Sequence, residues 1–436
     1  MSRDHLHTCS ILGAFFAANP VKDGVILYHS PAGCEKMVLH AACSHDLLGF
    51  ERDRLELCQV GNPEAVFGGE DKLRASVKRL LADRPGRHVF VTSSCAPEII
   101  GDDLAGVLRS LGSPRVTLLG GAGFRGDLWQ GFSDALALMV ESLVPEKARR
   151  RPSGDRVNVL GYLCDRLEHD HLANIRVITG MLSGLGLEVN TFLSGPTDTR
   201  QLRKSWDAGR NIAFDFGDKA ADALAGRCGQ EKVRVDYPIG LGGTAAFLRG
   251  AGRAVGRERK AEALISAGLR SAVPLIEAGR GTCRCKRVGV SADSQRLPGL
   301  VEFLLDLGMI PAWVQVLDEG RDVLPRLKAV LAGRCEKARI NPSPEQVRRM
   351  LPETDLLVGS HVEKYRYGRR VPVYESTYPC LDRHALSEEP DSGFEGAVRL
   401  ANNLANLLRM RNTRLFGLDD ELNRLGFEER FHFRRL

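Results

Sequence analysis

Short apolar runs alternate with longer amphipathic stretches along most of this 436-residue chain. The short runs are rich in Val, Ile, Leu and Phe and are bounded by turn residues, which is typical of strands buried on both faces of a sheet. The longer stretches carry apolar residues at helical spacing. This alternation predicts an α/β protein with parallel sheets covered by helices. We expect strands at residues 24–28, 88–92, 116–119, 157–163, 188–192, 211–214, 287–291, 310–316 and 355–358.

Two segments predict a division into three domains. The charged stretch 145–155 contains Pro and Gly and indicates one boundary, and the glycines at 279–282 indicate another. We therefore expect three Rossmann-like, doubly wound domains at residues 1–152, 153–280 and 281–436. The third would end in a long helix over about 394–411, where Ala, Leu, Asn and Arg recur at helical spacing.

Composition excludes several classes of protein. The 61 Lys+Arg and 55 Asp+Glu are scattered, whereas nucleic-acid binding requires clustered positive charge. Eleven cysteines without regular spacing argue against a secreted disulfide framework and for a reducing compartment. No apolar run reaches 18 residues, so we expect no membrane span. Residues 9–18 imitate a signal-peptide core, but the polar Asp4, His5 and His7 precede them, and the sequence predicts a cytoplasmic protein.

Cys9, Cys34 and Cys95 each lie where a strand-like apolar run gives way to a turn marked by Gly or Ser. Thiolates are ligands for iron, and cysteines far apart in sequence hold an iron–sulfur cluster when the fold brings their loops together. We expect Cys34 to begin a helix whose dipole lowers the thiol pKa. Three thiolates rarely complete a ligand set, so a second chain would supply the rest.

Other motifs leave alternatives open. Gly121, Gly123 and Gly126 form a G-x-G-x-x-G after a predicted strand, but the acidic residue expected about 20 positions on is missing, which disfavours a nicotinamide-dependent dehydrogenase. The pairs Cys283/Cys285 and His169/His171 lack further metal ligands. No phosphate-binding loop occurs, so any ATP would be hydrolysed by another protein. The other cysteines are expected to be small buried apolar residues: Cys43, Cys58, Cys164, Cys228, Cys335 and Cys380.

Six motifs, in order along nearly the whole chain, resemble the β subunit of the nitrogenase component-one superfamily. They are Cys9-Ser-Ile-Leu-Gly-Ala, His29-Ser-Pro-Ala-Gly-Cys34, Ala65-Val-Phe-Gly-Gly69, Thr92-Ser-Ser-Cys95-Ala-Pro-Glu-Ile-Ile-Gly-Asp-Asp-Leu104, Tyr237-Pro-Ile-Gly-Leu-Gly-Gly-Thr-Ala-Ala-Phe-Leu248 and Pro379-Cys-Leu-Asp-Arg-His384. The family fold has three Rossmann-like domains. This agrees with the independent reading of the apolar pattern.

The resemblance implies roles for particular residues. Cys9, Cys34 and Cys95 would be the β-side ligands of a P-cluster, an eight-iron, seven-sulfur (8Fe-7S) centre shared with an α-type subunit in an α2β2 heterotetramer. Phe67 would be the surface residue on which a homodimeric, ATP-dependent iron protein docks; the alternative is an ordinary hydrophobic loop anchor. Ala122 replaces a serine that ligates the oxidised cluster in dinitrogenases, and Thr377 stands where α subunits have a cofactor-binding His.

The expected function is therefore that of an oxidoreductase subunit that relays electrons rather than reducing the substrate itself. A dinitrogenase β subunit and a non-catalytic scaffold for cofactor assembly are the alternatives, although scaffolds usually lack the full cysteine trio. The chain begins eight residues before Cys9 and keeps a Cys where the B-type subunits of protochlorophyllide reductase have an Asp. In this it is most similar to the β subunit of methylthio-alkane reductase, which cleaves carbon–sulfur bonds.

Overall fold

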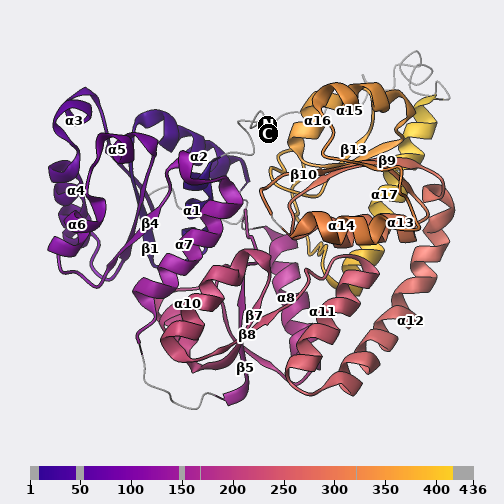
Figure 1. Ribbon diagram of the computed structural model, residues 1–436, viewed down its shortest axis with the longest axis horizontal. Helices are drawn as coiled ribbons and strands as arrows, with labels where there is room; N and C mark the ends of the chain where they lie inside the picture. Colours follow the sequence, from indigo (N-terminus) through magenta and orange to yellow (C-terminus); the bar gives the residue numbers. More distant parts are fainter. Residues whose placement is uncertain (1–8, 46–53, 147–152, 167, 321, 416–436) are drawn as a thin grey trace, which may run out of the picture.

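The computed structural model describes residues 9–45, 54–146, 153–166, 168–320 and 322–415, and it contains three α/β units, each built on its own parallel sheet (Figure 1). The predicted fold class is confirmed. The side chains of residues 40–45, 153 and 411–415 lie outside the description. In the described part, no helix is both long enough and apolar enough to cross a bilayer.

The first sheet has the strand order β2-β1-β3-β4 and all its pairings are parallel. Its strands are β1 (Gly24–Ser30), β2 (Leu55–Gln59), β3 (His88–Ser93) and β4 (Val116–Gly120). The surrounding helices are α1 (Ser10–Ala18), α2 (Ala32–His45), α3 (Asn62–Phe67), α4 (Glu70–Asp83), α5 (Cys95–Ile100), α6 (Leu104–Ser110), the 3-10 turn η2 (Gly123–Arg125) and α7 (Leu128–Leu143).

The second sheet has the order β6-β5-β7-β8 and is also parallel. Its strands are β5 (Ser153–Leu160), β6 (Glu188–Phe192), β7 (Ala208–Ala213) and β8 (Glu231–Arg234). Its helices are α8 (His169–Gly184), α9 (Thr199–Arg203), η3 (Lys204–Asp207), η4 (Asp215–Gly217), α10 (Asp218–Cys228), α11 (Gly240–Ala254) and α12 (Glu258–Cys283).

The third sheet has the order β11-β10-β9-β12-β13, again parallel. Its strands are β9 (Arg287–Ala292), β10 (Ile310–Val316), β11 (Arg339–Ile340), β12 (Leu356–Gly359) and β13 (Val373–Glu375). Its helices are α13 (Leu297–Asp306), α14 (Val323–Leu331), α15 (Pro344–Met350), η5 (Leu351–Glu353), α16 (His361–Tyr367) and α17 (Gly393–Leu415).

All nine predicted strands are present, with ends shifted by a few residues, and the predicted C-terminal helix is α17. The four described strands that the pattern did not predict, β2, β8, β11 and β13, all lie at sheet edges. The predicted boundary at residue 280 falls within α12, near its C-terminal end, and the division into three domains stays a prediction.

Helix α1 fixes the position of Cys9, the residue at its N-cap. All nine residues of α1 are buried, and the helix packs against α7 at very short range. Glycines permit this approach: a Cβ on Gly13 would lie 2.0 Å from the carbonyl oxygen of Leu128, and one on Gly131 would lie 2.2 Å from that of Ser10. A larger residue at either glycine would push α1, and Cys9 with it, away from α7.

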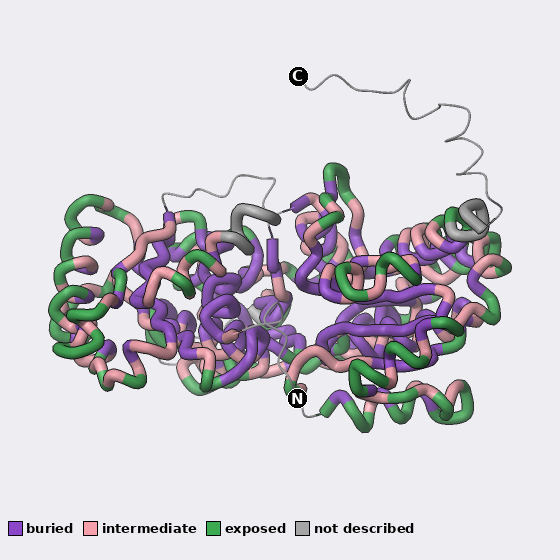
Figure 2. Tube along the Cα trace, turned by 90° about the horizontal axis from the view of Figure 1, so that it is seen from above, coloured by how far each residue is buried: buried purple, intermediate pink, exposed green. Residues whose placement is uncertain are grey.

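The hydrophobic cores join the three units. One core combines α1, α7 and β1 with residues of the second unit, and the largest runs through the second and third units. In Figure 2 the buried segments gather inside each lobe, while exposed residues lie mainly on peripheral helices and loops.

Candidate metal centre

Cys34 and Cys95 lie at the carboxyl edge of the first sheet. Cys34 follows β1 and is the third residue of α2, and Cys95 follows β3 and is the first residue of α5. Because β1 and β3 are hydrogen-bonded neighbours, with Gly24 opposite His88 and His29 opposite Ser93, both turns emerge at the same edge. The predicted strand-to-helix turns are therefore present at both cysteines.

Cys9 reaches the same edge from the start of α1. It forms an isolated antiparallel bridge with Asp127, and the adjacent Ser10 hydroxyl donates to the carbonyl oxygen of Ala122 at 2.7 Å. Ala122 belongs to the loop that follows β4, the neighbour of β3. The strand-like run expected before Cys9 lies outside the described residues.

Gly123 fills the space between two of the thiols. Its N–H donates to Sγ of Cys95 at 3.1 Å, and a Cβ at this position would lie 2.9 Å from Cβ of Cys9 and 3.4 Å from Sγ of Cys95. The glycine motif 121–126 is thus part of the cysteine site. It does not open a long helix directly, because η2 intervenes and α7 begins only at Leu128.

Two of the three thiols, those of Cys9 and Cys34, have raised pKa values. Burial raises the pKa of Cys9, against the backbone N–H groups of Ile11 and Leu12, and the nearby Cys34 and Cys95 raise it further. The expectation of a lowered pKa at Cys34 is wrong: burial raises the pKa of Cys34 and outweighs the opposing Ser94 hydroxyl. Metal binding at this site would therefore displace protons.

The donor set fits a polynuclear iron–sulfur cluster better than a single ion. Three half-buried thiols share one edge. In the described part of the chain, however, they do not form a group whose ligand atoms all lie within 4.8 Å of one another. A tetrahedral ion would hold sulfurs about 3.8 Å apart. Beside the thiols, the hydroxyl of Tyr28 is buried and has no hydrogen-bond partner among the described residues. An assembly larger than one ion suits this spacing.

Large apolar side chains are exposed on α3, α5 and η2. Phe67 at the end of α3 is 88% exposed, and Val66, Ile99 and Phe124 are also exposed. The ring of Phe67 therefore does not anchor its loop by burial. Its role in docking stays a prediction.

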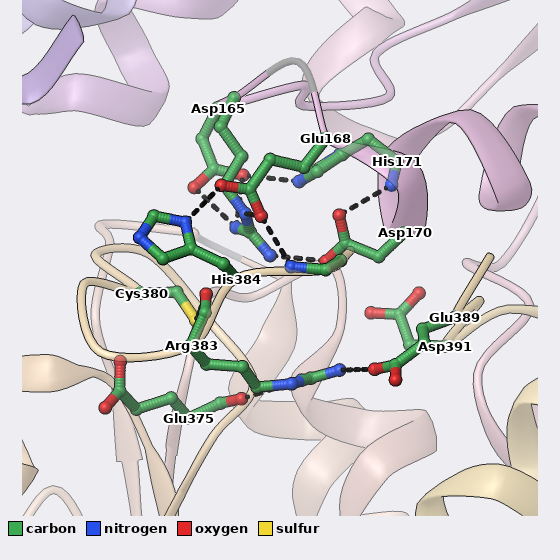
Figure 3. A network of polar contacts seen from close by, with 12 residues as sticks. Asp165, Glu168, Asp170, His171, Glu375, Cys380, Arg383, His384, Glu389 and Asp391 are labelled. Atoms are coloured by element: carbon green, nitrogen blue, oxygen red, sulfur yellow. Dashed lines mark hydrogen bonds and ion pairs between the residues drawn. The ribbon is translucent and has the colours of Figure 1, made fainter. Parts of the chain in front are cut away.

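A second site, which the sequence did not reveal, lies between the carboxyl edges of the second and third sheets. It is a polar cavity lined by residues of β13 and by residues that follow β5, β9 and β13. Figure 3 shows the ionic network at its wall. The dense run of charged residues over 165–171, directly after a predicted strand, was the available signal.

Buried ion pairs fill one side of this polar cavity. The Arg166 guanidinium contacts Asp165 at 3.2 Å, Glu168 at 3.3 Å and also Asp170. His171 lies 2.8 Å from Asp165 and 2.8 Å from the Tyr162 hydroxyl. Burial alone would lower the pKa of His171, but Cys164 and the two aspartates outweigh it and raise the pKa to about 10. His171 is thus engaged in the ionic network, which leaves the His169/His171 metal pair without support.

On the opposite side of the polar cavity, the charged side chains also have partners. Glu389 pairs with Arg383 at 3.0 Å and with Arg399, and Thr377 donates to Asp293 at 3.3 Å. Burial raises the pKa of Cys380 to about 12, so its thiol is neutral. Thr377 and Cys380 therefore lie in a cavity whose charges are already paired.

The remaining candidate ligands do not assemble into a comparable centre. Cys283 is buried and Cys285 is exposed, so their side chains lie in different surroundings. Oxygen or nitrogen atoms of His361, Glu375 and Asp382 lie within 4.8 Å of one another, but Lys364 is 2.9 Å from Glu375 and 3.0 Å from Asp382 and supplies the cation. Three of the other cysteines are buried as expected, namely Cys58, Cys164 and Cys380. Two are only half-buried, Cys228 and Cys335, and the side chain of Cys43 lies outside the description.

Comparisons with known proteins agree with the arrangement. The family model described as nitrogenase component 1 type oxidoreductase matches residues 9–409. The chain is 26% identical to the nitrogenase iron-iron protein beta chain of Rhodobacter capsulatus, over 92% of this chain and 93% of that one. It is 24% identical to the nitrogenase vanadium-iron protein beta chain of Trichormus variabilis, with the same coverage. A solved structure titled nitrogenase Cp1 at pH 6.5 superposes with a TM-score of 0.80 at 20% identity, over 94% of this chain and 93% of that one.

Proposed function

Because this chain belongs to the nitrogenase component 1 type oxidoreductase family and is of the beta type, we propose that it is an electron-relay subunit. One observation carries the proposal: the thiols of Cys9, Cys34 and Cys95 converge on one sheet edge from three separate loops. Burying thiols at one edge is unfavourable when no metal is bound. Iron binding would displace the thiol protons and contribute a binding free energy that offsets this cost.

In this proposal the three cysteines are the ligands that this chain contributes to a P-cluster-type 8Fe-7S centre. The bound centre would supply one-electron redox chemistry. Gly123 lies between Cys9 and Cys95 without a side chain to crowd them, and it donates its N–H to the Cys95 sulfur, a contact that would orient this ligand. Ala122 has no hydroxyl, so we expect no serine ligand on oxidation.

Three ligands leave the centre incomplete, and the half-exposed thiols indicate where it is completed. We propose that an α-type subunit covers this edge in an α2β2 heterotetramer and contributes the remaining ligands. The exposed Phe67 would contact a homodimeric, ATP-dependent iron protein that delivers the electrons. Electrons would then pass on to a cofactor in the α-type subunit.

The polar cavity supports the view that this chain does not itself reduce the substrate. Its arginines are paired with carboxylates, and Thr377 stands where the resemblance would require a His ligand. Placing a metal cofactor there would break several buried ion pairs, each costly to open. Reduction is therefore assigned to the partner subunit.

For the substrate, we propose a methylthio-alkane. Two electrons and two protons would cleave the carbon–sulfur bond, giving methanethiol and a hydrocarbon. A dinitrogenase is the second candidate, because the relatives reported above are named nitrogenase beta chains. Anaerobic assays of the α–β complex with its iron protein and MgATP separate the two. Methanethiol formed from a methylthio-alkane, without ammonia formed from dinitrogen, supports the first; the reverse result overturns it.

The relay function is tested by iron analysis and electron paramagnetic resonance of the α–β complex and of this chain alone. We expect an eight-iron centre only in the complex. A full centre in the isolated chain would overturn the shared-ligand proposal, and a complex without iron would overturn the relay itself.

A further inference from the structure

A buried chain of three polar side chains lies under the exposed surface at Phe67. The His29 ring, at the end of β1, places Nδ1 3.3 Å from Sγ of Cys58 and Nε2 3.2 Å from Oδ2 of Asp102. The side chains of His29 and Asp102 are 0% and 2% exposed. Burial lowers the pKa of His29, although Asp102 opposes this. The neutral ring therefore donates from Nε2 to Asp102 and accepts at Nδ1 from the Cys58 thiol.

Asp102 also holds the segment that follows Phe67. Its second oxygen, Oδ1, accepts the N–H of Gly69 at 2.9 Å. Gly68 has φ +87°, and a Cβ on Gly69 would lie 2.7 Å from the His29 ring and 2.9 Å from Asp102. Glycine is required at both positions, by conformation at the first and by space at the second. The backbone after Phe67 thus packs directly on the His29–Asp102 pair.

The same pair is built into both cysteine loops. The carbonyl oxygen of His29 accepts the N–H of Ser94, the residue before Cys95, at 3.3 Å. Asp102 lies just beyond the C-terminal end of α5, the short helix that Cys95 begins, and its N–H is bonded to the carbonyl of Pro97. His29 precedes the turn that leads to Cys34. A displacement of Gly69 therefore reaches His29 through Asp102, and it reaches the Cys95 loop through the hydrogen bonds of Pro97 and Ser94.

We propose that Asp102, acting through His29, is a positioning residue that transmits docking at Phe67 to the loops of Cys34 and Cys95. This inference rests on the proposed function, because it takes Phe67 as a docking residue and the cysteines as cluster ligands. The alternative is a purely structural role, in which Asp102 only stabilises the fold. The two differ in whether the cysteine loops respond to docking.

Amide hydrogen exchange tests this response directly. Peptides covering 62–69 and 94–101 are followed in the iron-loaded α–β complex, with and without the iron protein held by a non-hydrolysable ATP analogue. In the wild type, docking changes exchange in both segments. In Asp102→Asn, which keeps the shape but removes the charge, docking changes 62–69 alone. A response of 94–101 that survives in Asp102→Asn overturns the proposal.

A kinetic split provides the second readout. Loss of a hydrogen bond to a charged group corresponds to about a tenfold effect. We expect Asp102→Asn to lower the rate of electron delivery at saturating iron protein about tenfold, with the KM for the iron protein and the iron content unchanged. The control is Asp103→Asn, whose carboxylate accepts the N–H of Gly106 and so caps α6, and which does not contact His29 in the described part of the chain. It should behave as the wild type. Equal rates for the two variants contradict the proposal.

If Asp102→Asn loses iron, a second pair of variants distinguishes transmission of docking from a purely structural role. His29→Gln offers an amide that donates to Asp102 in place of Nε2, whereas His29→Leu offers none. We expect docking to alter exchange in 94–101 in His29→Gln and not in His29→Leu. Identical behaviour of the two overturns the inference. Failure of the proposed function shows differently: the complex then lacks iron, or Phe67→Ala leaves iron-protein binding unchanged, before any of these variants is compared.

Discussion

The cysteine site at the edge of the first sheet and the polar cavity between the second and third sheets differ in how far each is completed within this chain. In the polar cavity, Arg166 contacts three carboxylates and His171 has partners at both ring nitrogens. At the cysteine site, the thiols are half-buried, the pKa values of Cys9 and Cys34 are raised, and the Tyr28 hydroxyl has no hydrogen-bond partner among the described residues.

Both sites occupy the place where parallel sheets usually bind ligands, beyond the carboxyl ends of their strands. The difference teaches that location alone does not identify the functional site. A cavity whose charges neutralise one another stabilises the contact between two units and has little left to offer a ligand. Under the proposed function, a site with half-buried thiols and exposed apolar side chains beside them is completed by a metal cluster and a partner subunit.

The largest effect on stability is expected from Arg166→Met, which leaves buried carboxylates without their cation. Opening a buried ion network in this way costs about 3–5 kcal/mol. Urea unfolding of the α–β complex should show this loss, while folded Arg166→Met keeps its iron. The matched control is Arg176→Met, because Arg176 is 51% exposed and pairs with Glu388 and Glu395 at the surface. Its cost should stay within about 1 kcal/mol. Equal losses in the two variants would contradict this account of the polar cavity.

A smaller and pH-dependent effect is expected from His171→Gln. The pKa of His171 is raised to about 10 in the folded protein, against about 6.5 unfolded. Its ionic contribution is therefore fully present below about pH 6.5 and is lost as the pH rises through about 10. We expect the variant to be less stable than the wild type by about 2 kcal/mol at pH 6, with the difference shrinking by pH 10. A difference that stays constant across this range would show that His171 is not charged.

Phe67→Ala tests the exposed apolar surface near the cysteine site and should affect only the binding of the iron protein. Removing an exposed aromatic anchor weakens a docking surface by about 1–2 kcal/mol, or about tenfold in affinity. Titration of the α–β complex with the iron protein measures this, and iron content and melting temperature should not change. The control is Leu275→Ala on α12, an apolar residue that is 62% exposed. Equal affinity of both variants would remove Phe67 from the docking surface.

The apolar pattern predicted the inner strands of all three sheets and missed strands at the edges. Inner strands such as β1 and β3 are buried along their whole length, and their continuous apolar runs are recognisable. The missed edge strands are polar or short: β8 reads Glu-Lys-Val-Arg, and β11 has only two residues. Their residues have partners on one side only, so the sequence carries little trace of them.

For the candidate site, the turns at Cys34 and Cys95 could be predicted, and the protonation of Cys34 could not. Turn residues are local, whereas desolvation depends on which distant segments cover the thiol. The roles of Gly123 and Asp102 were invisible for the same reason. Each acts on residues about 28 to 114 positions away in the chain, which only the fold brings into contact.

The central claim, that the cysteines at the first sheet edge hold iron, is tested most directly by iron per αβ pair in Cys95→Ala. The matched control is Cys335→Ala, since Cys335 is also a half-buried free thiol but lies in the third unit. We predict that Cys95→Ala loses most of its iron and binds the α-type subunit less tightly, whereas Cys335→Ala loses at most about 1 kcal/mol of stability and keeps its iron. Wild-type iron content in purified Cys95→Ala would contradict the account.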